Sequence, residues 1–156
     1  MSQSGFTPHD HSGCIAQTLG AAEALCAREG LQFTPLRRRV LEILLTGHKA
    51  LGAYEILDRL GADGFSAKPP TAYRALEFLT AHGLAHKIER LNAYIACTHP
   101  GEAHNPAFLI CTDCETVAET EAPAAVGPAA KAAGFKVKAT TVEATGTCPA
   151  CQAARP

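Results

Sequence analysis

The sequence contains two pairs of cysteines with identical spacing, Cys111-x-x-Cys114 and Cys148-x-x-Cys151. Each pair predicts a tight knuckle in which both thiolates can face one ion. Two such knuckles complete a tetrahedral four-sulfur shell without an open position, which is the arrangement that holds structural zinc. A redox-active dithiol is the other chemistry open to such a pair. We expect structural zinc, which would stabilise a C-terminal domain of about 60 residues.

A second group of potential metal ligands lies between positions 86 and 119, on both sides of the first cysteine pair. It comprises His86, Cys97, His99, His104 and Glu119. A single histidine is usually an ordinary core or surface residue, but several candidates here converge where a predicted hairpin meets a connector rich in turn-forming residues. A mixed set of nitrogen, sulfur and oxygen donors suits zinc, and the thiolate disfavours manganese or ferrous iron. The sequence therefore predicts a second, metal-sensing site between two domains.

Composition and charge limit the classes of protein to consider. The chain has 156 residues, of which 47% are hydrophobic and 19% charged, which suits one globular domain or two small ones. A net charge of −1 does not favour nucleic-acid binding, so any DNA interface must rest on local patches. Seven cysteines, without a secretory signal or a membrane-spanning apolar run, predict a cytoplasmic protein whose thiols bind metal.

Helical periodicity dominates the first half of the chain. After a polar segment at 1–12, which predicts a flexible arm, apolar spacing predicts helices over 13–29, from Pro35 through Leu44, over 53–60 and over 68–83. Thr34 supplies a capping side chain, and Pro35 suits the first helical position. Two short β-like runs follow, at 84–89 and 93–97. Helices followed by a hairpin are typical of a winged helix, whose recognition helix enters the DNA major groove.

The helix over 68–83 carries the candidates for contact with DNA bases. Its apolar face is predicted at Ala72, Leu76 and Leu79, and Arg74 points nearly opposite. An arginine can donate two hydrogen bonds to guanine, and Tyr73 can contact a thymine methyl group or a phosphate. Basic residues that could contact phosphates are Arg37, Arg38, Arg39 and Lys68.

The rest of the chain predicts a mixed α/β domain. Residues 98–106 are turn formers and predict a hinge. Strands are expected at 108–111, 116–119 and 135–143, and a helix at 122–133. The predicted fold class is therefore α+β, with a winged-helix domain over 1–97 and a smaller α/β domain over 98–156 that holds the four-cysteine zinc knuckles.

Taken together, these residues resemble the ferric uptake regulator superfamily, and most closely its zinc uptake regulator branch. The resemblance runs from Thr34-Pro35 through Cys151 and is carried by KPPTAYRALEFL at 68–79, His86-Lys87, FLICTDC at 108–114 and the terminal knuckle. Members of that family are homodimeric, metal-dependent transcriptional repressors with a C-terminal dimerisation domain. The iron-sensing branch typically carries a dense histidine run before the first knuckle. This chain has only His99 and His104 there, which favours zinc over iron.

The resemblance also implies a role for each candidate residue. It places structural zinc on Cys111, Cys114, Cys148 and Cys151, and regulatory zinc on His86, Cys97, His104 and Glu119, which gives two zinc ions per subunit. It places base contacts at Tyr73 and Arg74, and Thr71, Lys68, Arg37 and Arg38 complete the expected DNA-binding set. The implied function is a zinc-responsive repressor of zinc uptake genes that binds palindromic operators as a zinc-loaded dimer.

Other functions remain open from the sequence alone. One is a sensor of iron, manganese or peroxide built on the same scaffold. Another is a zinc-dependent hydrolytic enzyme that would use His86, Cys97 and His104 as ligands, an open water position, and Glu119 as general base. A protein-interaction module stabilised by zinc is a further alternative. Coordination distinguishes the first two classes, because a sensor site has four protein ligands and an enzyme site has three plus water.

Overall fold

Helices form the first part of the chain. The computed structural model describes residues 6, 11–66, 68–102, 104–124 and 126–155, so most of the predicted N-terminal arm lies outside the described residues. The helices are α1 (His11–Glu29), α2 (Pro35–Leu44), α3 (Ala53–Ala62) and α4 (Pro69–Ala81). Their apolar faces share one core, which includes Leu25, Val40, Leu44, Ile56, Leu60, Leu76 and Leu79. None of the described helices has the length and apolarity needed to cross a membrane.

Local sequence explains where the helices α2 and α4 begin. Thr34 has an extended backbone, and its hydroxyl accepts a hydrogen bond from the Arg37 N–H at 3.3 Å, while Pro35 occupies the first turn. Pro69 and Pro70 open α4 after the extended Lys68. The buried residues of α4 are Ala72, Ala75, Leu76 and Leu79, as the periodicity predicts. Tyr73 and Arg74 consequently face away from the core.

A hairpin follows α4. It consists of β1 (Ala85–Ile88), a short 3-10 turn η1 (Glu89–Leu91) and β2 (Ala93–Ala96), with His86 opposite Ile95. Asn92 closes the turn in the left-handed region at φ 47° and donates to the Glu89 carbonyl at 3.2 Å. The predicted hairpin is therefore confirmed, and with α2–α4 it completes a winged helix.

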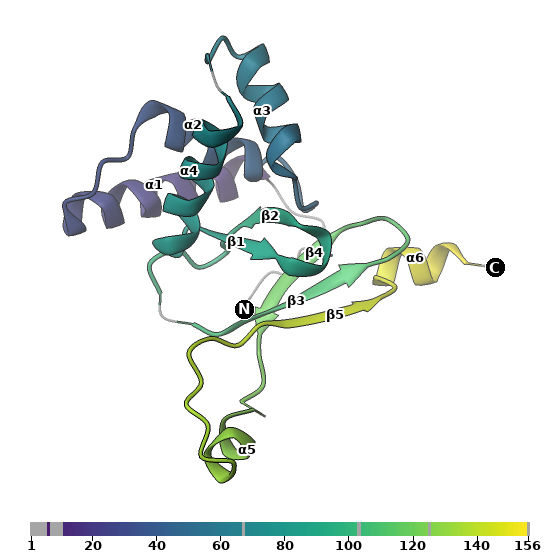
Figure 1. Cartoon of the computed structure of the whole chain (residues 1–156). Helices are drawn as coiled ribbons and strands as arrows, with labels where there is room; N and C mark the ends of the chain where they lie inside the picture. Colours follow the sequence, from purple (N-terminus) through teal and green to yellow (C-terminus); the bar gives the residue numbers. More distant parts are fainter. Residues whose placement is uncertain (1–5, 7–10, 67, 103, 125, 156) are drawn as a thin grey trace.

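A three-stranded sheet forms the centre of the C-terminal part (Figure 1). Its strands are β3 (Pro106–Cys111), β4 (Val117–Glu121) and β5 (Val142–Gly146), in the order β4-β3-β5. β4 is antiparallel to β3, whereas β5 is parallel to β3. A parallel neighbour requires a crossover, and the segment containing α5 (Val126–Ala132) provides it. The predicted α+β fold class is confirmed.

Two sequence expectations fail in this part. The predicted strand at 135–143 is wrong for most of its length, because β5 begins only at Val142. The alternation around Phe135 and Val137 resembles a strand, but both side chains are exposed, at 68% and 38%, and the pairing with β3 begins later. The sequence predicts only a cysteine knuckle and no helix at the chain end, whereas the structure forms the helix α6 (Pro149–Ala154), with Pro149 in its first turn.

The hairpin packs directly against the C-terminal sheet. Ile88 and Ile95 of the hairpin share an apolar cluster with Phe108, Ile110 and Val117 of the sheet. In Figure 1 the hairpin accordingly lies between the helices and β3. The segment 48–51, between α2 and α3, adds backbone contacts to both parts: Leu51 pairs with Tyr94, Lys49 pairs with Thr116, and the Val117 N–H donates to the His48 carbonyl at 2.7 Å. The two halves are thus in close contact in this arrangement.

Candidate metal centres and DNA-binding helix

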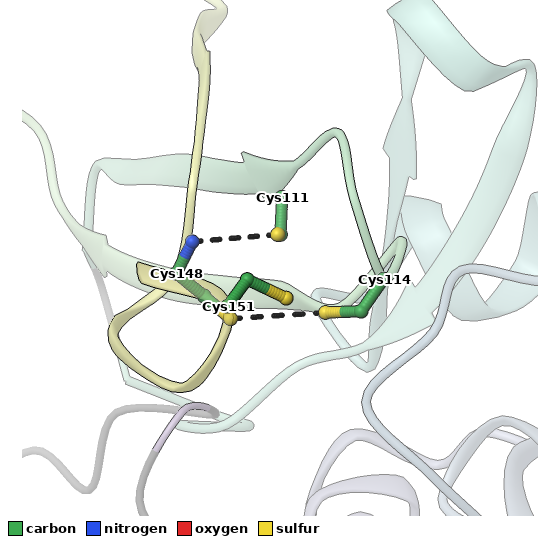
Figure 2. Close-up of side chains that lie close together, drawn as sticks. All are labelled: Cys111, Cys114, Cys148 and Cys151. Atoms are coloured by element: carbon green, nitrogen blue, oxygen red, sulfur yellow. Dashed lines mark hydrogen bonds between the residues drawn. The ribbon is translucent and has the colours of Figure 1, made fainter. Parts of the chain in front are cut away.

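The four cysteines of the two knuckles converge at one end of the sheet. Cys111 ends β3, Cys114 lies in the β3–β4 turn, and Cys148 and Cys151 lie at the start of α6 and within it. Their sulfur atoms all lie within 4.8 Å of one another, and Figure 2 shows the four side chains gathered together. The Cys114 and Cys148 sulfurs are 3.7 Å apart. Zinc–sulfur bonds of about 2.3 Å at tetrahedral angles place the sulfurs about 3.8 Å apart, so the cluster has the size of a Zn(Cys)4 site.

Local hydrogen bonds favour the thiolate form of the first knuckle. The backbone N–H of Cys148 donates to the Cys111 sulfur at 3.3 Å and is the main reason why the pKa of Cys111 is lowered to about 6. The Thr116 hydroxyl, 3.2 Å from the Cys114 sulfur, lowers the pKa of Cys114. In contrast, hydrogen bonding with Cys148 raises the pKa of Cys151 to about 12. A cation is therefore needed for all four sulfurs to be thiolates together.

The second group gathers at the junction between the hairpin and the sheet. His86 comes from β1, Cys97 directly follows β2, His104 precedes β3 and Glu119 lies on β4. One ligand atom from each lies within 4.8 Å of the others. The Cys97 sulfur is 3.5 Å from His104 Nε2 and 4.0 Å from Glu119 Oε1, and Glu119 Oε1 is 3.4 Å from His86 Nε2.

The protonation of these groups follows from their surroundings. Burial is the main reason why the pKa of Cys97 is raised to about 12, and the Glu119 charge adds to it. Burial alone would raise the pKa of Glu119, but the His86 ring, the Thr98 N–H at 3.0 Å and His104 outweigh it and lower that pKa to about 2. Glu119 is therefore a buried carboxylate, only 5% exposed, which requires cationic or hydrogen-bonding partners.

The donor set fits a zinc ion. Zinc bonds of about 2.0–2.3 Å at tetrahedral angles separate ligand atoms by about 3.3–3.8 Å, close to the 3.4–4.0 Å of three donor pairs, whereas His104 Nε2 and Glu119 Oε1 lie 2.7 Å apart, at hydrogen-bonding distance. His86 Nε2 is buried, and although Glu119 Oε1 lies 3.4 Å away, it makes no well-directed hydrogen bond to a described residue, as expected of an atom that binds metal. His104 Nδ1 lies 2.8 Å from the Glu102 carbonyl, which orients Nε2 toward the cluster. His99 lies beside the group, and its backbone N–H donates to the Cys97 sulfur at 3.3 Å, but its ring is outside the set.

Sequence reasoning missed the residues that support this second set. The Thr98 N–H and the Glu102 carbonyl orient Glu119 and His104, yet neither carries a side-chain signal that could be read from the sequence. Both lie in the segment 98–106, where the sequence indicates turn formers and candidate histidine ligands but no supporting backbone contacts.

The side chains predicted to contact DNA fall into two groups. Tyr73, Arg74 and Lys68 are exposed, Thr71 is half-buried, and no hydrogen bond or ion pair holds the Arg74 or Lys68 side chain to any described residue. The arginines of α2 instead have partners within the N-terminal half. Arg37 donates to the Gln32 carbonyl at 2.6 Å and lies 3.9 Å above the Phe78 ring centre. Arg38 pairs with Glu23 and Glu42, and Arg39 with Glu42 and Asp63.

Comparison with known proteins identifies the family to which this chain belongs. The model of the ferric uptake regulator family matches residues 28–145. The chain belongs to the ferric uptake regulator family. It is 37% identical over 139 residues to the zinc uptake regulation proteins of Escherichia coli and Shigella flexneri, covering 86% of this chain and 81% of each relative.

Solved structures of this family extend the comparison. A zinc uptake regulator complexed with zinc and DNA is 34% identical, with a TM-score of 0.83 over 94% of this chain and 98% of that one. The holo form of XcZur is 41% identical, with a TM-score of 0.78 over 86% and 96% of the two chains. The apo form of XcZur has nearly the same identity, 39%, over 88% and 97%, but a TM-score of only 0.52. The structure described here is therefore more similar to the holo form of XcZur than to its apo form.

Proposed function

We propose that this protein is a zinc-responsive, DNA-binding transcriptional repressor that controls zinc uptake genes. The observation that carries the proposal is the second donor set, which joins the winged-helix hairpin to the C-terminal sheet through a thiol, two imidazoles and a buried carboxylate. The likeness to a regulator solved with both zinc and DNA supports it. A cytoplasmic location accompanies the proposal.

The ligand geometry supplies a mechanism for the response. We assign a DNA-binding domain to 1–97, a dimerisation and metal-binding domain to 98–156, and a hinge to about 98–106. His86 and Cys97 belong to the first domain, and His104 and Glu119 to the second. All four can bind one ion only when the domains are closed together, so binding shifts the population toward the closed form. A coupling of about 2.7 kcal/mol is enough to change DNA affinity about 100-fold.

The two sites have separate roles in this proposal. Each subunit would hold two zinc ions. The regulatory ion would be bound by His86, Cys97, His104 and Glu119, which come from both domains. The structural ion would be bound by Cys111, Cys114, Cys148 and Cys151, which all lie in the C-terminal part. The four-cysteine site would therefore stabilise the C-terminal domain without responding to its orientation relative to the DNA-binding domain.

A homodimer would present two recognition helices to a palindromic operator. The C-terminal part exposes several apolar side chains that suit a subunit interface, namely Leu109, Val126, Phe135 and Val137. Two-fold symmetry of such a dimer would match the symmetry of the operator, because each winged helix reads one half-site. Closure of the two domains within each subunit would then fix the spacing between the two recognition helices.

On the DNA, α4 supplies the base contacts in this proposal. Arg74 and Tyr73 project from the second turn and would enter the major groove, with Thr71 beside them and Lys68 close to the phosphates. Arg37 and Arg38 remain predicted phosphate contacts, and they would approach DNA while held by Gln32, Glu23 and Glu42.

Replacing Arg74 by alanine should relax the base preference at one position of each half-site by about 1–3 kcal/mol. The reason is that a guanidinium can donate two hydrogen bonds to guanine, whereas alanine donates none. Binding to a panel of single-base operator variants would measure it. Lys68→Ala is the matched control and should weaken binding to every operator equally. A uniform loss for Arg74→Ala would make it a phosphate contact instead.

Zinc binding to the regulatory set should release about one proton near neutral pH. The Cys97 thiol is protonated before binding, because its pKa is raised to about 12, and only the thiolate binds zinc. The affinity should therefore fall about tenfold for each pH unit lowered. Below the pH range in which His104 becomes protonated, the zinc affinity should fall more steeply with decreasing pH. Although burial acts the other way, the Glu102 carbonyl and Glu119 raise the pKa of His104. Calorimetry in buffers of different ionisation enthalpy would count the protons, and a pH-independent affinity would contradict the prediction.

The alternatives are disfavoured by the donor set. Iron or manganese sensors of the same fold tolerate oxygen-rich ligands better than a buried thiolate. A hydrolytic enzyme requires an open position, whereas the set described here has four protein donors that surround one point. The cavities of about 460 and 300 Å³ found among the described residues are lined by none of these donors. The family is one of regulators.

DNA binding titrated with buffered metal would test the proposal. A palindromic site selected from a random library would be labelled and followed by fluorescence anisotropy. We expect tight binding only when free zinc exceeds the concentration that fills the four-cysteine site. Equal activation by Fe²⁺ or Mn²⁺ under anaerobic conditions would instead make the protein a sensor of those metals. Selection of no DNA under any metal would overturn the regulator function.

A further inference from the structure

The C-terminal sheet carries a second acidic side chain that contacts the hairpin. Glu143 of β5 accepts hydrogen bonds from two consecutive backbone N–H groups of the turn η1, those of Glu89 at 2.6 Å and Arg90 at 3.1 Å. Each oxygen of the carboxylate serves one donor. The contact joins residues 53 and 54 positions apart in the sequence, so it is a contact between the two proposed domains.

Glu143 occupies a row of the sheet that also contains a regulatory ligand. Phe108 of β3 is in register with Glu119 of β4 on one side and with Glu143 of β5 on the other. Residues in register on neighbouring strands point to the same face of a sheet. Both carboxylates therefore project toward the hairpin, and Phe108 between them lies 5.4 Å from the His86 ring, centre to centre.

The two carboxylates hold opposite ends of the hairpin. Glu119 lies at the open end, beside His86, Cys97 and the Thr98 N–H. Glu143 lies at the closed end, at the turn between β1 and β2. The apolar cluster that includes Ile88 and Ile95 lies between them. With a metal site at one end only, the turn of the hairpin is held against the sheet by non-directional apolar contacts, and the Glu143 hydrogen bonds add a directional fixed point there.

We propose that Glu143 is a positioning residue, which holds the turn of the hairpin against the C-terminal sheet and so favours the closed arrangement that binds zinc and DNA. The proposal rests on the proposed function for its effect on DNA. The contact itself requires no metal, and it occurs in a fold that matches the holo rather than the apo form of XcZur. A hydrogen bond from a backbone N–H group to a carboxylate is about twice as strong as one between neutral groups. Two such bonds can therefore shift the equilibrium between the open and closed arrangements of the domains.

Substitution of Glu143 would test this role. Glu143→Ala should shift the midpoint of zinc-dependent DNA binding to about tenfold higher free zinc, since allosteric coupling is typically 5–150-fold. Glu143→Asp keeps the charge but is too short to serve both donors, so it should shift the midpoint in the same direction. Loss of a negative charge alone would strengthen DNA binding. A weakening in Glu143→Ala therefore cannot arise from charge.

Glu121→Ala is the matched control, because it removes an exposed carboxylate from β4 of the same sheet. It should leave the midpoint unchanged. A second measurement, zinc affinity of the regulatory set by chelator competition without DNA, should show the same loss in the Glu143 variants, while the zinc held by the four cysteines stays as in the wild type. If Glu143→Ala fails to fold, Glu143→Gln, which keeps one acceptor, should show a smaller shift.

The outcomes separate the two proposals. Wild-type protein that binds no DNA with zinc would overturn the proposed function, and the chelator competition would still test Glu143. Wild-type binding that Glu143→Ala and Glu143→Asp change by less than about twofold would overturn the positioning role. An equal shift in Glu121→Ala would do the same.

Discussion

Cys97→Ser is expected to abolish zinc-dependent DNA binding, with a loss of at least about 100-fold in affinity at saturating zinc. The serine hydroxyl is nearly the same size as the thiol but stays protonated and is a poor zinc ligand. The remaining donors cannot hold the hairpin and the sheet together through one ion. Although Cys97 is only 1% exposed, serine is nearly isosteric with it, so no large cavity or clash forms and the protein should remain folded. Anisotropy with the selected operator and zinc content per subunit would measure the effect.

A matched control exists in the helical core. Cys26 is 2% exposed and belongs to neither metal set, so Cys26→Ser makes the same atomic change at the same depth. It should affect stability modestly and leave zinc-dependent binding intact. If the Cys97→Ser variant unfolded, Cys97 would have a structural role. If the variant bound DNA as the wild type does, Cys97 would not be a ligand of the regulatory ion.

Cys111→Ser should have the opposite pattern, with loss of structure as its first effect. Structural zinc contributes an apparent 10–16 kcal/mol in small zinc domains, whereas whole domains are stable by about 5–15 kcal/mol. Losing one of four ligands should therefore remove on the order of 5 kcal/mol and unfold much of the C-terminal part. Thermal unfolding followed by circular dichroism, together with zinc content, would measure this. DNA binding should disappear as well, because β3 and β4 position His104 and Glu119.

The half-buried Cys14 of α1 provides the comparison for this variant. Cys14→Ser should retain the wild-type melting curve and both zinc ions. A wild-type melting curve for Cys111→Ser would mean that the four cysteines do not stabilise the domain through an ion.

Local patterns explain why much of the fold could be predicted from the sequence. Thr34-Pro35 and the paired prolines that open α4 act within a few residues, so the starts of both helices can be predicted directly from the sequence. The Cys-x-x-Cys spacing is equally local. In contrast, β5 is defined by its pairing with β3 some 35 residues away, and the alternation at 135–141 lacks such a partner. The sequence therefore placed that strand too early.

The candidate sites likewise contain some features that local sequence predicts and others that depend on the tertiary fold. The four-cysteine set follows from spacing, but the choice of His104 over His99 came from the family resemblance, and the structure brings His104 into the cluster while His99 lies beside it. Helical spacing places Glu42 beside Arg38 and Arg39. The pairs Arg38–Glu23 and Arg39–Asp63 and the contact of Glu143 with the hairpin depend on the tertiary fold. No periodicity or motif encodes them.

Within the proposed mechanism, the segment 48–51 has a consequence for the form in which the two domains are apart. It covers the outer edge of β4 through Lys49 and His48, and it pairs with β2 through Leu51. Separation of the domains would uncover the edge of β4, and an uncovered strand edge can pair with another chain and begin aggregation. The sequence of β4, VAETE, carries two glutamates and no run of apolar residues. Negative charge on this edge would keep the zinc-free protein soluble while its domains are apart.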